Sequence, residues 1–443
     1  MKPFLLAPLV AALVAGAAVR SSDSVNYDGF KVFRVNTKGQ FRSVQEKLST
    51  LSFEQWDFDP ARHMDIVLAP EQLTAFKDLN LDYHCMHEDL GASIAAESVS
   101  KSIWKRQADD LSWYDNYHPY DDHRTYFEDL QASFPNNSEF VSSGTSYEGR
   151  DLYGLHLYGA GGPGKPAVLW HGTVHAREWI TAMVIEYLTL NLLTGYATDN
   201  VTQSFLDNYD FYIFPFVNPD GFVHSQTVNR LWRKNRQPPP PTAENQTCFG
   251  RDINRQWPWS WNDSSPPGGS SPNPCSQTYR GESPSDGPEN QGLVALVNKL
   301  RDQQGIKLYI DWHSYGQYIL SPWGYNCTVY AETLGQHTKL AALTGDAIRT
   351  GANGTTFTFG PSCSTLYATS GSSVDYIYGV GQAKFSYTIE LRDTGDYGFV
   401  LPPAQIRGSV EEQWAGMRTM LALLDEEFFD GLGPAAEFGE IRR

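Results

Sequence analysis

The sequence predicts an α/β protein with a mainly parallel sheet covered by helices on both faces, preceded by a small α+β unit. From about residue 113 to 427, apolar strand-like runs alternate with long helix-like stretches, which is typical of a parallel sheet. Residues 25–95 alternate short strands and helices on a smaller scale. Hydrophobic residues make up 41% and charged residues 19% of the 443 residues, which excludes a disordered chain and allows two or three domains.

The first 18 residues are interpreted as a signal peptide. A lysine near the start is followed by an apolar run at 4–14 and by small residues at 15–18. A membrane anchor is the alternative, but the run falls short of the roughly 20 residues that a bilayer requires. A secreted, extracellular glycoprotein is therefore expected, with sequons at Asn136, Asn200, Asn245, Asn262, Asn326 and Asn353. The formal charge of -17 disfavours nucleic acid and anionic membranes as partners.

The small unit at 25–95 is predicted to contain strands at 31–35, 65–68 and 81–84 and helices at 44–51 and 70–79. Residues 96–112 form a polar linker in which the basic pair Lys105–Arg106 is the kind of site that a processing protease cuts. A solvated linker with two incidental basic residues is the alternative interpretation.

The large unit at 113–430 is predicted from its strands at 166–171, 211–217, 306–312 and 384–391. The helices are expected at 178–193, 289–301, 332–350 and 410–425, and residues 431–443 form a C-terminal tail. Residues 237–288 are rich in Pro, Gly and Ser and are expected to form a long irregular loop.

Five cysteines in a secreted chain leave one unpaired. Cys85 lies far from the other four, so two bridges are expected among Cys248, Cys275, Cys327 and Cys363. The residues alone leave all three pairings open.

A metal site is indicated by His175 and Glu178, which form the one H-x-x-E motif and directly follow a predicted strand. His313 follows a second strand, and carboxyl ends of parallel strands converge at one edge of a sheet. Two His and one Glu leave a fourth position open, which is the composition of a hydrolytic zinc site. His171 could replace His175, but its place within the strand favours a structural role.

Glu390 ends an apolar strand, where a buried charge needs a reason. It could act as a general base, or it could form an ion pair with Arg392. Arg233 and Arg255 offer guanidinium groups suited to a carboxylate or an oxyanion. Solvated surface arginines are the ordinary explanation.

Seven motifs, HAREW, NPDGF, NRLWRK, DINRQW, IDWHSYGQ, TLYATSGSS and IELRDTG, occur in the order found in the carboxypeptidase A/B group of zinc exopeptidases. The chain resembles this group from about residue 113 to 427. The resemblance implies a mixed eight-stranded sheet flanked by helices, and residues 25–95 resemble the activation segment of its proenzymes.

The resemblance also implies roles for single residues. His175, Glu178 and His313 would bind one Zn²⁺, Glu390 would be the general base and Arg233 would stabilise the oxyanion. The terminal carboxylate of the substrate would be held by Asn254, Arg255 and Tyr367, with Arg150 along the approach and Asp252 fixing His175. The disulfides would be Cys248–Cys275 and Cys327–Cys363.

The residue aligned with the base of the group's specificity pocket is Val374, with Leu320, Gly324 and Thr388 as walls, which implies an A-type preference for aromatic or aliphatic termini. Gln256, Thr369 and the proline-rich insert depart from the usual pattern. The implied protein is a monomeric proenzyme, inhibited by its own propeptide until a protease cuts the linker. A secreted, inactive relative that binds peptide C termini is the alternative.

Overall fold

The computed structural model describes residues 24–97, 111–263, 269–351 and 354–426. The expected signal peptide, the Lys105–Arg106 site, the sequon at Asn353 and the tail at 431–443 lie outside these residues. In the part that is described, no single helix is long and apolar enough to cross a membrane. The bent pair Ile180–Gly195 and Asn200–Asn208 meets that criterion by length and composition only.

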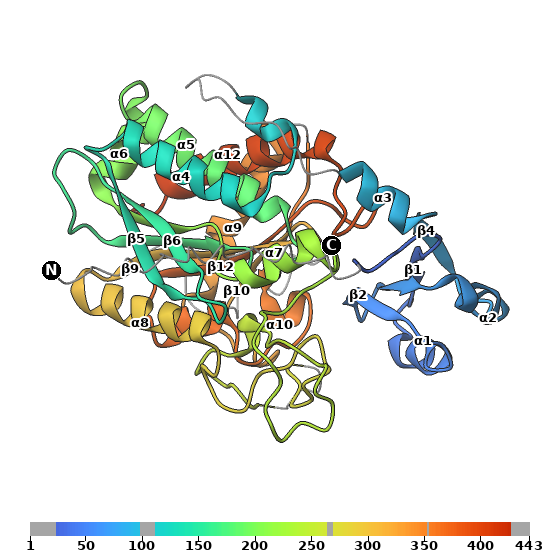
Figure 1. The fold of residues 1–443 in the computed structure, drawn as a ribbon. Coiled ribbons are helices and arrows are strands. Elements are labelled where there is room, and N and C mark those ends of the chain that lie inside the picture. The colour runs from blue at the N-terminus through green and yellow to red at the C-terminus, as the bar shows by residue number, and fades with distance from the viewer. Residues whose placement is uncertain (1–23, 98–110, 264–268, 352–353, 427–443) are drawn as a thin grey trace, which may run out of the picture.

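The small domain, residues 24–97, is a four-stranded antiparallel sheet with helices against it (Figure 1). The strand order is β2-β3-β1-β4, so β2 is an edge strand. Val35, Leu48, Ile66 and Phe76 are fully buried in its core. Its elements are β1 (Lys31–Asn36), α1 (Phe41–Leu48), β2 (Glu54–Asp59), β3 (His63–Leu68), η1 (Pro70–Gln72), α2 (Leu73–Asp78), β4 (Tyr83–His87) and α3 (Leu90–Glu97).

The large domain contains a mixed eight-stranded sheet in the order β11-β10-β12-β9-β7-β8-β6-β5. The four central strands β12, β9, β7 and β8 are mutually parallel, whereas β10 and β6 pair antiparallel to them. The prediction of a mainly parallel, mixed sheet is confirmed. The strands are β5 (Ser138–Thr145), β6 (Asp151–Leu157), β7 (Ala167–Gly172), β8 (Asp210–Phe214), β9 (Ile306–Ser314), β10 (Tyr318–Ser321), β11 (Thr358–Pro361) and β12 (Phe385–Leu391).

Both faces of the central strands are buried, as their nearly continuous apolar sequences require. Along β7, Val168 and Trp170 face one core while Ala167 and Leu169 face the other, because successive side chains of a strand point to opposite faces. Figure 1 shows α4, α5 and α12 on one side of the sheet and α8 on the other.

The predicted helices of the large domain lie within a few residues of those observed. The helices are η2 (Leu111–Asp115), α4 (Tyr120–Ser133), α5 (Ile180–Gly195), α6 (Asn200–Asn208), α7 (Pro219–Thr227), η3 (Ile253–Arg255), α8 (Pro288–Gln303), α9 (Leu334–Gly351), α10 (Ser362–Thr365), α11 (Ser373–Gly379), η4 (Pro403–Gln405) and α12 (Ile406–Ala422).

The long segment 237–288 is irregular where it is described, apart from the short η3 turn. Two disulfides tie loops of the large domain together, Cys248–Cys275 and Cys327–Cys363, which are the two pairs that the resemblance implied. Cys85 is the free thiol. Of the described sequon residues, Asn136, Asn200, Asn245 and Asn262 are exposed and Asn326 is half-buried.

Candidate active site

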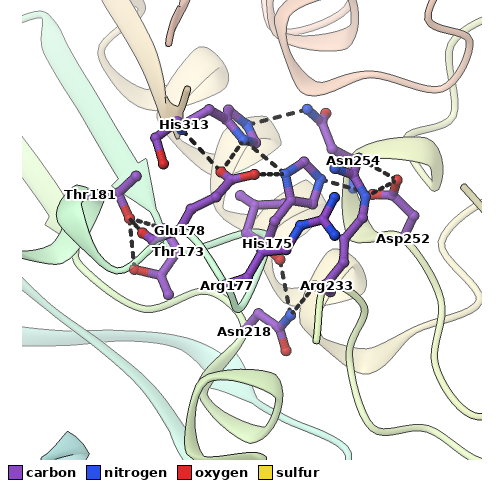
Figure 2. Close-up of polar contacts among 12 residues, drawn as sticks. Thr173, His175, Arg177, Glu178, Thr181, Asn218, Arg233, Asp252, Asn254 and His313 are labelled. Atoms are coloured by element: carbon purple, nitrogen blue, oxygen red, sulfur yellow. Dashed lines mark hydrogen bonds and ion pairs between the residues drawn. The ribbon is translucent and has the colours of Figure 1, made fainter. Parts of the chain in front are cut away.

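Three side chains that could hold a metal ion meet at the carboxyl edge of the parallel strands (Figure 2). His175 and Glu178 lie in the turn between β7 and α5, and His313 lies near the end of β9. The Nδ1 atom of His175 is 2.8 Å from Glu178 Oε1, the Nδ1 atom of His313 is 3.0 Å from Glu178 Oε2, and the two Nδ1 atoms are 3.1 Å apart. All three side chains are almost fully buried.

The helix that follows begins later than predicted. It starts at Ile180, so His175 and Glu178 belong to a turn closed by the bond from Glu178 N to His175 O at 3.1 Å. The turn, rather than a regular helical surface, brings the two side chains together.

Buried carboxylates hold the outer nitrogens of both imidazoles. Asp252 Oδ1 lies 3.2 Å from His175 Nε2, and Asp252 Oδ2 accepts from Arg233 Nη2 at 2.8 Å. Burial opposes ionisation of Asp252, but Arg233 and His175 keep its pKa well below the usual range. Asp311 Oδ2 lies 2.9 Å from His313 Nε2. Such partners fix the orientation and tautomer of metal-binding histidines.

Asp311 is a site residue that the sequence prediction missed. It precedes His313 by two positions, so both side chains lie on the same face of β9. That spacing was the available signal. His171, the alternative ligand, instead lies 3.4 Å from Asp311 Oδ1 and hydrogen-bonds with the Tyr309 hydroxyl.

Glu390 lies next to His313 on the neighbouring strand, because the two residues are paired in the register of β12 and β9. Burial raises the pKa of Glu390 to about 8, His313 lowers it and the Glu178 charge raises it further. The alternative ion pair with Arg392 is wrong, since Arg392 binds Glu412 through two nitrogens at 2.8 and 2.6 Å.

A cavity opens beside these groups. Its lining includes the predicted residues His175, Glu178, Arg233, Asn254, Arg255, His313, Leu320, Tyr367, Val374, Thr388 and Glu390. It also includes residues for which no role was predicted: Trp56, Asp57, Ser314, Tyr315, Ser362, Leu366, Thr369, Ser372 and Phe399.

Two of the predicted substrate-binding residues lie outside the lining. Arg150 is on the β5–β6 turn, where its Nη1 donates to Asp220 at 2.7 Å and also pairs with Glu148. Gly324 lies behind the wall, with its N–H donating to Asp375 at 2.8 Å and its carbonyl accepting from Thr369 N at 2.8 Å.

A family model described as zinc carboxypeptidase matches residues 123–416. The chain belongs to the zinc carboxypeptidase family. The metallocarboxypeptidase A of Trichophyton tonsurans is 45% identical over 427 residues, 95% of this chain and 99% of that protein. The zinc carboxypeptidase A 1 of Anopheles gambiae is 33% identical, with 94% of each chain covered.

Solved structures give the same relationship. The crystal structure of thrombin activatable fibrinolysis inhibitor is 25% identical with a TM-score of 0.80, covering 89% of this chain and 98% of that one. The carboxypeptidase A from Helicoverpa armigera is 26% identical with a TM-score of 0.76, covering 90% and 99%. This chain is accordingly a hydrolase, a metallocarboxypeptidase of the A type.

The donor set fits the zinc that the carboxypeptidase family implies. Two imidazole nitrogens and a carboxylate oxygen within 4.8 Å of one another are the ligands of a hydrolytic zinc site. One other described set, Asp57, His63 and Asp65, lies equally close. It suits a cation poorly, because both oxygens of Asp65 accept hydrogen bonds from Arg34 and one also from Tyr315.

The edge strand β2 of the small domain reaches the carboxypeptidase cavity. Trp56 and Asp57 line the cavity, and the Phe58 ring stacks on Tyr367 with centroids 4.5 Å apart and planes inclined by 15°. Arg177 donates to the Trp56 carbonyl at 3.1 Å and lies 3.3 Å from Glu54. Sequence reasoning placed the small domain before the enzyme but did not identify these contacts.

Proposed function

We propose that this chain is a secreted proenzyme whose mature form removes one residue from the C terminus of peptides. The observation that carries the proposal is the convergence of His175, Glu178, His313 and Glu390 with two buried arginines on one cavity. A purely structural zinc site would need neither a carboxylate beside it nor guanidinium groups in an adjoining cavity.

His175, Glu178 and His313 would hold the zinc, which supplies Lewis acidity to the scissile carbonyl and to the attacking water. Glu390 removes a proton from that water as its oxygen bonds to the carbonyl carbon. It then delivers the proton to the leaving amine as the C–N bond breaks. Arg233, held by Asp252, donates to the oxyanion that develops on the carbonyl oxygen.

The substrate's terminal carboxylate would bind Arg255, Asn254 and Tyr367. Arg255 donates through Nη1 to the Asn254 carbonyl at 2.8 Å, while its buried Nε meets no acceptor among the described residues. A buried cationic donor without an acceptor is costly, and a carboxylate of the substrate would satisfy it. Arg150 lies outside the cavity, so any contribution from it would come during approach.

An aromatic or aliphatic terminal residue would enter the part of the cavity lined by Leu320, Leu366 and Val374. Burying an apolar side chain there stabilises the complex by about 25 cal/mol per Å². A cationic side chain would lose its hydration without gaining an anion from Val374.

The proposed inhibitor is the small domain itself. Trp56 and Asp57 of its strand β2 line the cavity, and the Phe58 ring stacks on the ring of Tyr367. A second anchor is Glu97 at the end of α3, which binds Arg230 through two hydrogen bonds at 2.5 and 2.6 Å. Cleavage of the linker near Lys105–Arg106 would permit this domain to leave. Secretion and glycosylation at the sequons are supported by the two disulfides and the exposed asparagines.

The test uses protein whose linker has been cut and a peptide ending in Phe, compared with the same peptide amidated at its C terminus. Release of Phe from the free acid alone, loss of that release with a chelator and its recovery with zinc are expected. Binding of the peptide with a free C-terminal carboxylate, without release of Phe, would instead indicate an inactive protein that captures C termini.

The side-chain preference is tested with Val374→Asp and the neutral variant of equal size, Val374→Asn. Wild type should prefer terminal Phe and Leu, and only Val374→Asp should shift towards Lys and Arg. Better cleavage of Lys and Arg by wild type would reject the A-type preference.

A further inference from the structure

A further buried histidine lies behind the proposed zinc site. His171 is 1% exposed and is paired in register on β7 with Asp311 of β9, so both side chains lie on the same face of the sheet. Its Nε2 atom meets the Tyr309 hydroxyl, and its Nδ1 atom lies 3.4 Å from Asp311 Oδ1. His171 is not one of the described residues that could together hold a metal ion, so any role in the site has to act through Asp311.

The two oxygens of Asp311 have different surroundings. Oδ2 lies 2.9 Å from His313 Nε2 and accepts a hydrogen bond from the Ser373 hydroxyl. Oδ1 has no hydrogen-bond partner among the described residues, and neither has the Nδ1 atom of His171 that lies next to it. A buried carboxylate oxygen without a donor is unfavourable. His171 is therefore placed to stabilise the second oxygen of this carboxylate.

The Tyr309 hydroxyl favours the form of the His171 ring that suits this role. Burial lowers the pKa of His171 and raises that of Tyr309 well above its usual range, so the imidazole is neutral and the phenol can donate to Nε2. A neutral imidazole that accepts at one nitrogen carries its N–H at the other. The N–H is then on Nδ1, beside Asp311. The opposite tautomer would place a lone pair 3.4 Å from a carboxylate oxygen, which is repulsive.

We propose that His171 is a positioning residue of the zinc site: it holds the carboxylate of Asp311, which in turn fixes the imidazole of His313. The inference rests on the proposed zinc-dependent function. With its Nε2–H directed to Asp311, the His313 ring keeps the lone pair of Nδ1 for a metal, on the side where His175 and Glu178 lie. Loss of a partner that orients a metal-binding histidine typically weakens metal binding roughly 10- to 100-fold. His171 acts one contact further out, so a loss of about tenfold is expected.

Two amide variants separate this role from ordinary packing in the core. The side-chain amide of His171→Asn can take the position of Nδ1 and donate to Asp311. The longer side chain of His171→Gln places its amide at the position of Nε2, near Tyr309, and offers no donor to Asp311. Both replacements are neutral and polar, so a purely structural role of the histidine would be disturbed by either.

The experiment measures the zinc affinity of the intact full-length chain by competition with a chelator, after removal of any bound metal. His171→Gln should bind zinc roughly tenfold more weakly than wild type, and His171→Asn should stay within about threefold of wild type. The second readout is the rise in Tm on adding zinc, which depends on the affinity and should shrink in His171→Gln. A merely structural role would lower Tm equally with and without zinc.

Equal zinc affinity in wild type and His171→Gln, or equal losses in His171→Gln and His171→Asn, would overturn the inference. If neither variant folds, Tyr309→Phe tests the same contacts, because without the phenol the N–H of His171 can move to Nε2, away from Asp311. Its zinc affinity should fall a few-fold, and an unchanged affinity would overturn the inference. Wild type that binds no zinc would refute the proposed function itself, whereas equal zinc binding by wild type and variants would refute only the role of His171.

Discussion

Removing the carboxylate of Glu97 should open the proposed proenzyme without any cut in the chain. Glu97 belongs to the small domain and is 1% exposed, and its partner Arg230 in the large domain is 5% exposed. Arg230 also donates to the carbonyls of Arg177 and Phe399, each at 2.7 Å, and lies 3.8 Å from the Trp179 ring centroid. Glu97→Gln therefore leaves a guanidinium fixed in place and buried without its counter-charge.

The magnitude follows from the burial of both partners. Breaking a buried ion pair by removing one partner costs about 3–5 kcal/mol. Glu97 leaves together with the small domain, so the loss of its charge affects only the state in which the two domains are in contact. At 1.4 kcal/mol per factor of ten, the open fraction should rise about one hundred- to a few thousand-fold.

The assay measures release of a terminal Phe from a short peptide by intact proenzyme, with chain length checked on a gel before and after. Glu54→Gln is expected to have a smaller effect, because the Glu54 side chain is 31% exposed and lies 3.3 Å from Arg177. The activity of the intact proenzyme should rise at most a few-fold in this variant. Glu71→Gln, an exposed glutamate of the small domain, is the control for loss of charge. Intact Glu97→Gln proenzyme with no more activity than the Glu71→Gln control would refute the reasoning.

Three further predictions concern the large domain. Glu390→Gln should retain zinc, measured by atomic absorption. Its kcat should fall roughly 10²–10⁴-fold, because an amide cannot accept the proton of the water. Near-normal turnover would remove Glu390 from the mechanism. Gly324→Ala should lower Tm by several degrees, because the added Cβ would lie 2.2 Å from Thr369 Oγ1. Adding Thr369→Ala should restore the Tm. Equal Tm values for Gly324→Ala and for the double variant would contradict the clash. Burial raises the pKa of Asp375 from 3.8 to about 7 against the backbone N–H bonds that lower it, so its contribution to stability is complete below about pH 4 and is lost as the pH rises to about 7. Thermal unfolding between pH 4 and 8 should therefore show a steeper fall in Tm for wild type than for Asp375→Asn, and parallel curves would exclude Asp375 as the group responsible.

The sequence predicted the centre of the large sheet better than its edges. Strands β7, β9 and β12 are buried on both faces and consist of nearly continuous apolar runs, which are easy to recognise. Strands β10 and β11 have four residues each, and β5 carries mostly half-exposed polar residues, so neither length nor pattern marks them. In the small domain β2 was missed because its sequence, EQWDFD, alternates acidic and aromatic residues.

The candidate ligand His313 and the candidate base Glu390 could be predicted because their positions follow from topology. His313 and Glu390 lie near the ends of adjacent parallel strands. Locating the strand ends in the sequence is therefore enough to predict that the two side chains lie close together. The cavity walls and the contacts across the domain boundary could not be predicted in this way. Phe58 meets Tyr367 across 309 positions of sequence, a separation that the spacing of residues within a motif does not encode. The polar part of the cavity wall has the same origin, because Ser362 lies at the start of the four-residue helix α10 and Thr369 lies in a loop.

The turn that carries the proposed metal ligands His175 and Glu178 also contacts the small domain. Arg177 lies between His175 and Glu178 in sequence, and its buried guanidinium donates to the Trp56 carbonyl and lies 3.9 Å from the Phe399 ring centroid. The His175 and Glu178 side chains point to the proposed zinc site, so this turn positions both the proposed ligands and the contact with the small domain. A cut at Lys105–Arg106 removes neither the Arg177 contacts nor the Glu97–Arg230 pair. In the proposed proenzyme, activity should therefore follow dissociation of the small domain rather than cleavage itself. The delay between the two should shorten in Glu97→Gln, because its covered state is less stable while the cleavage site is unchanged.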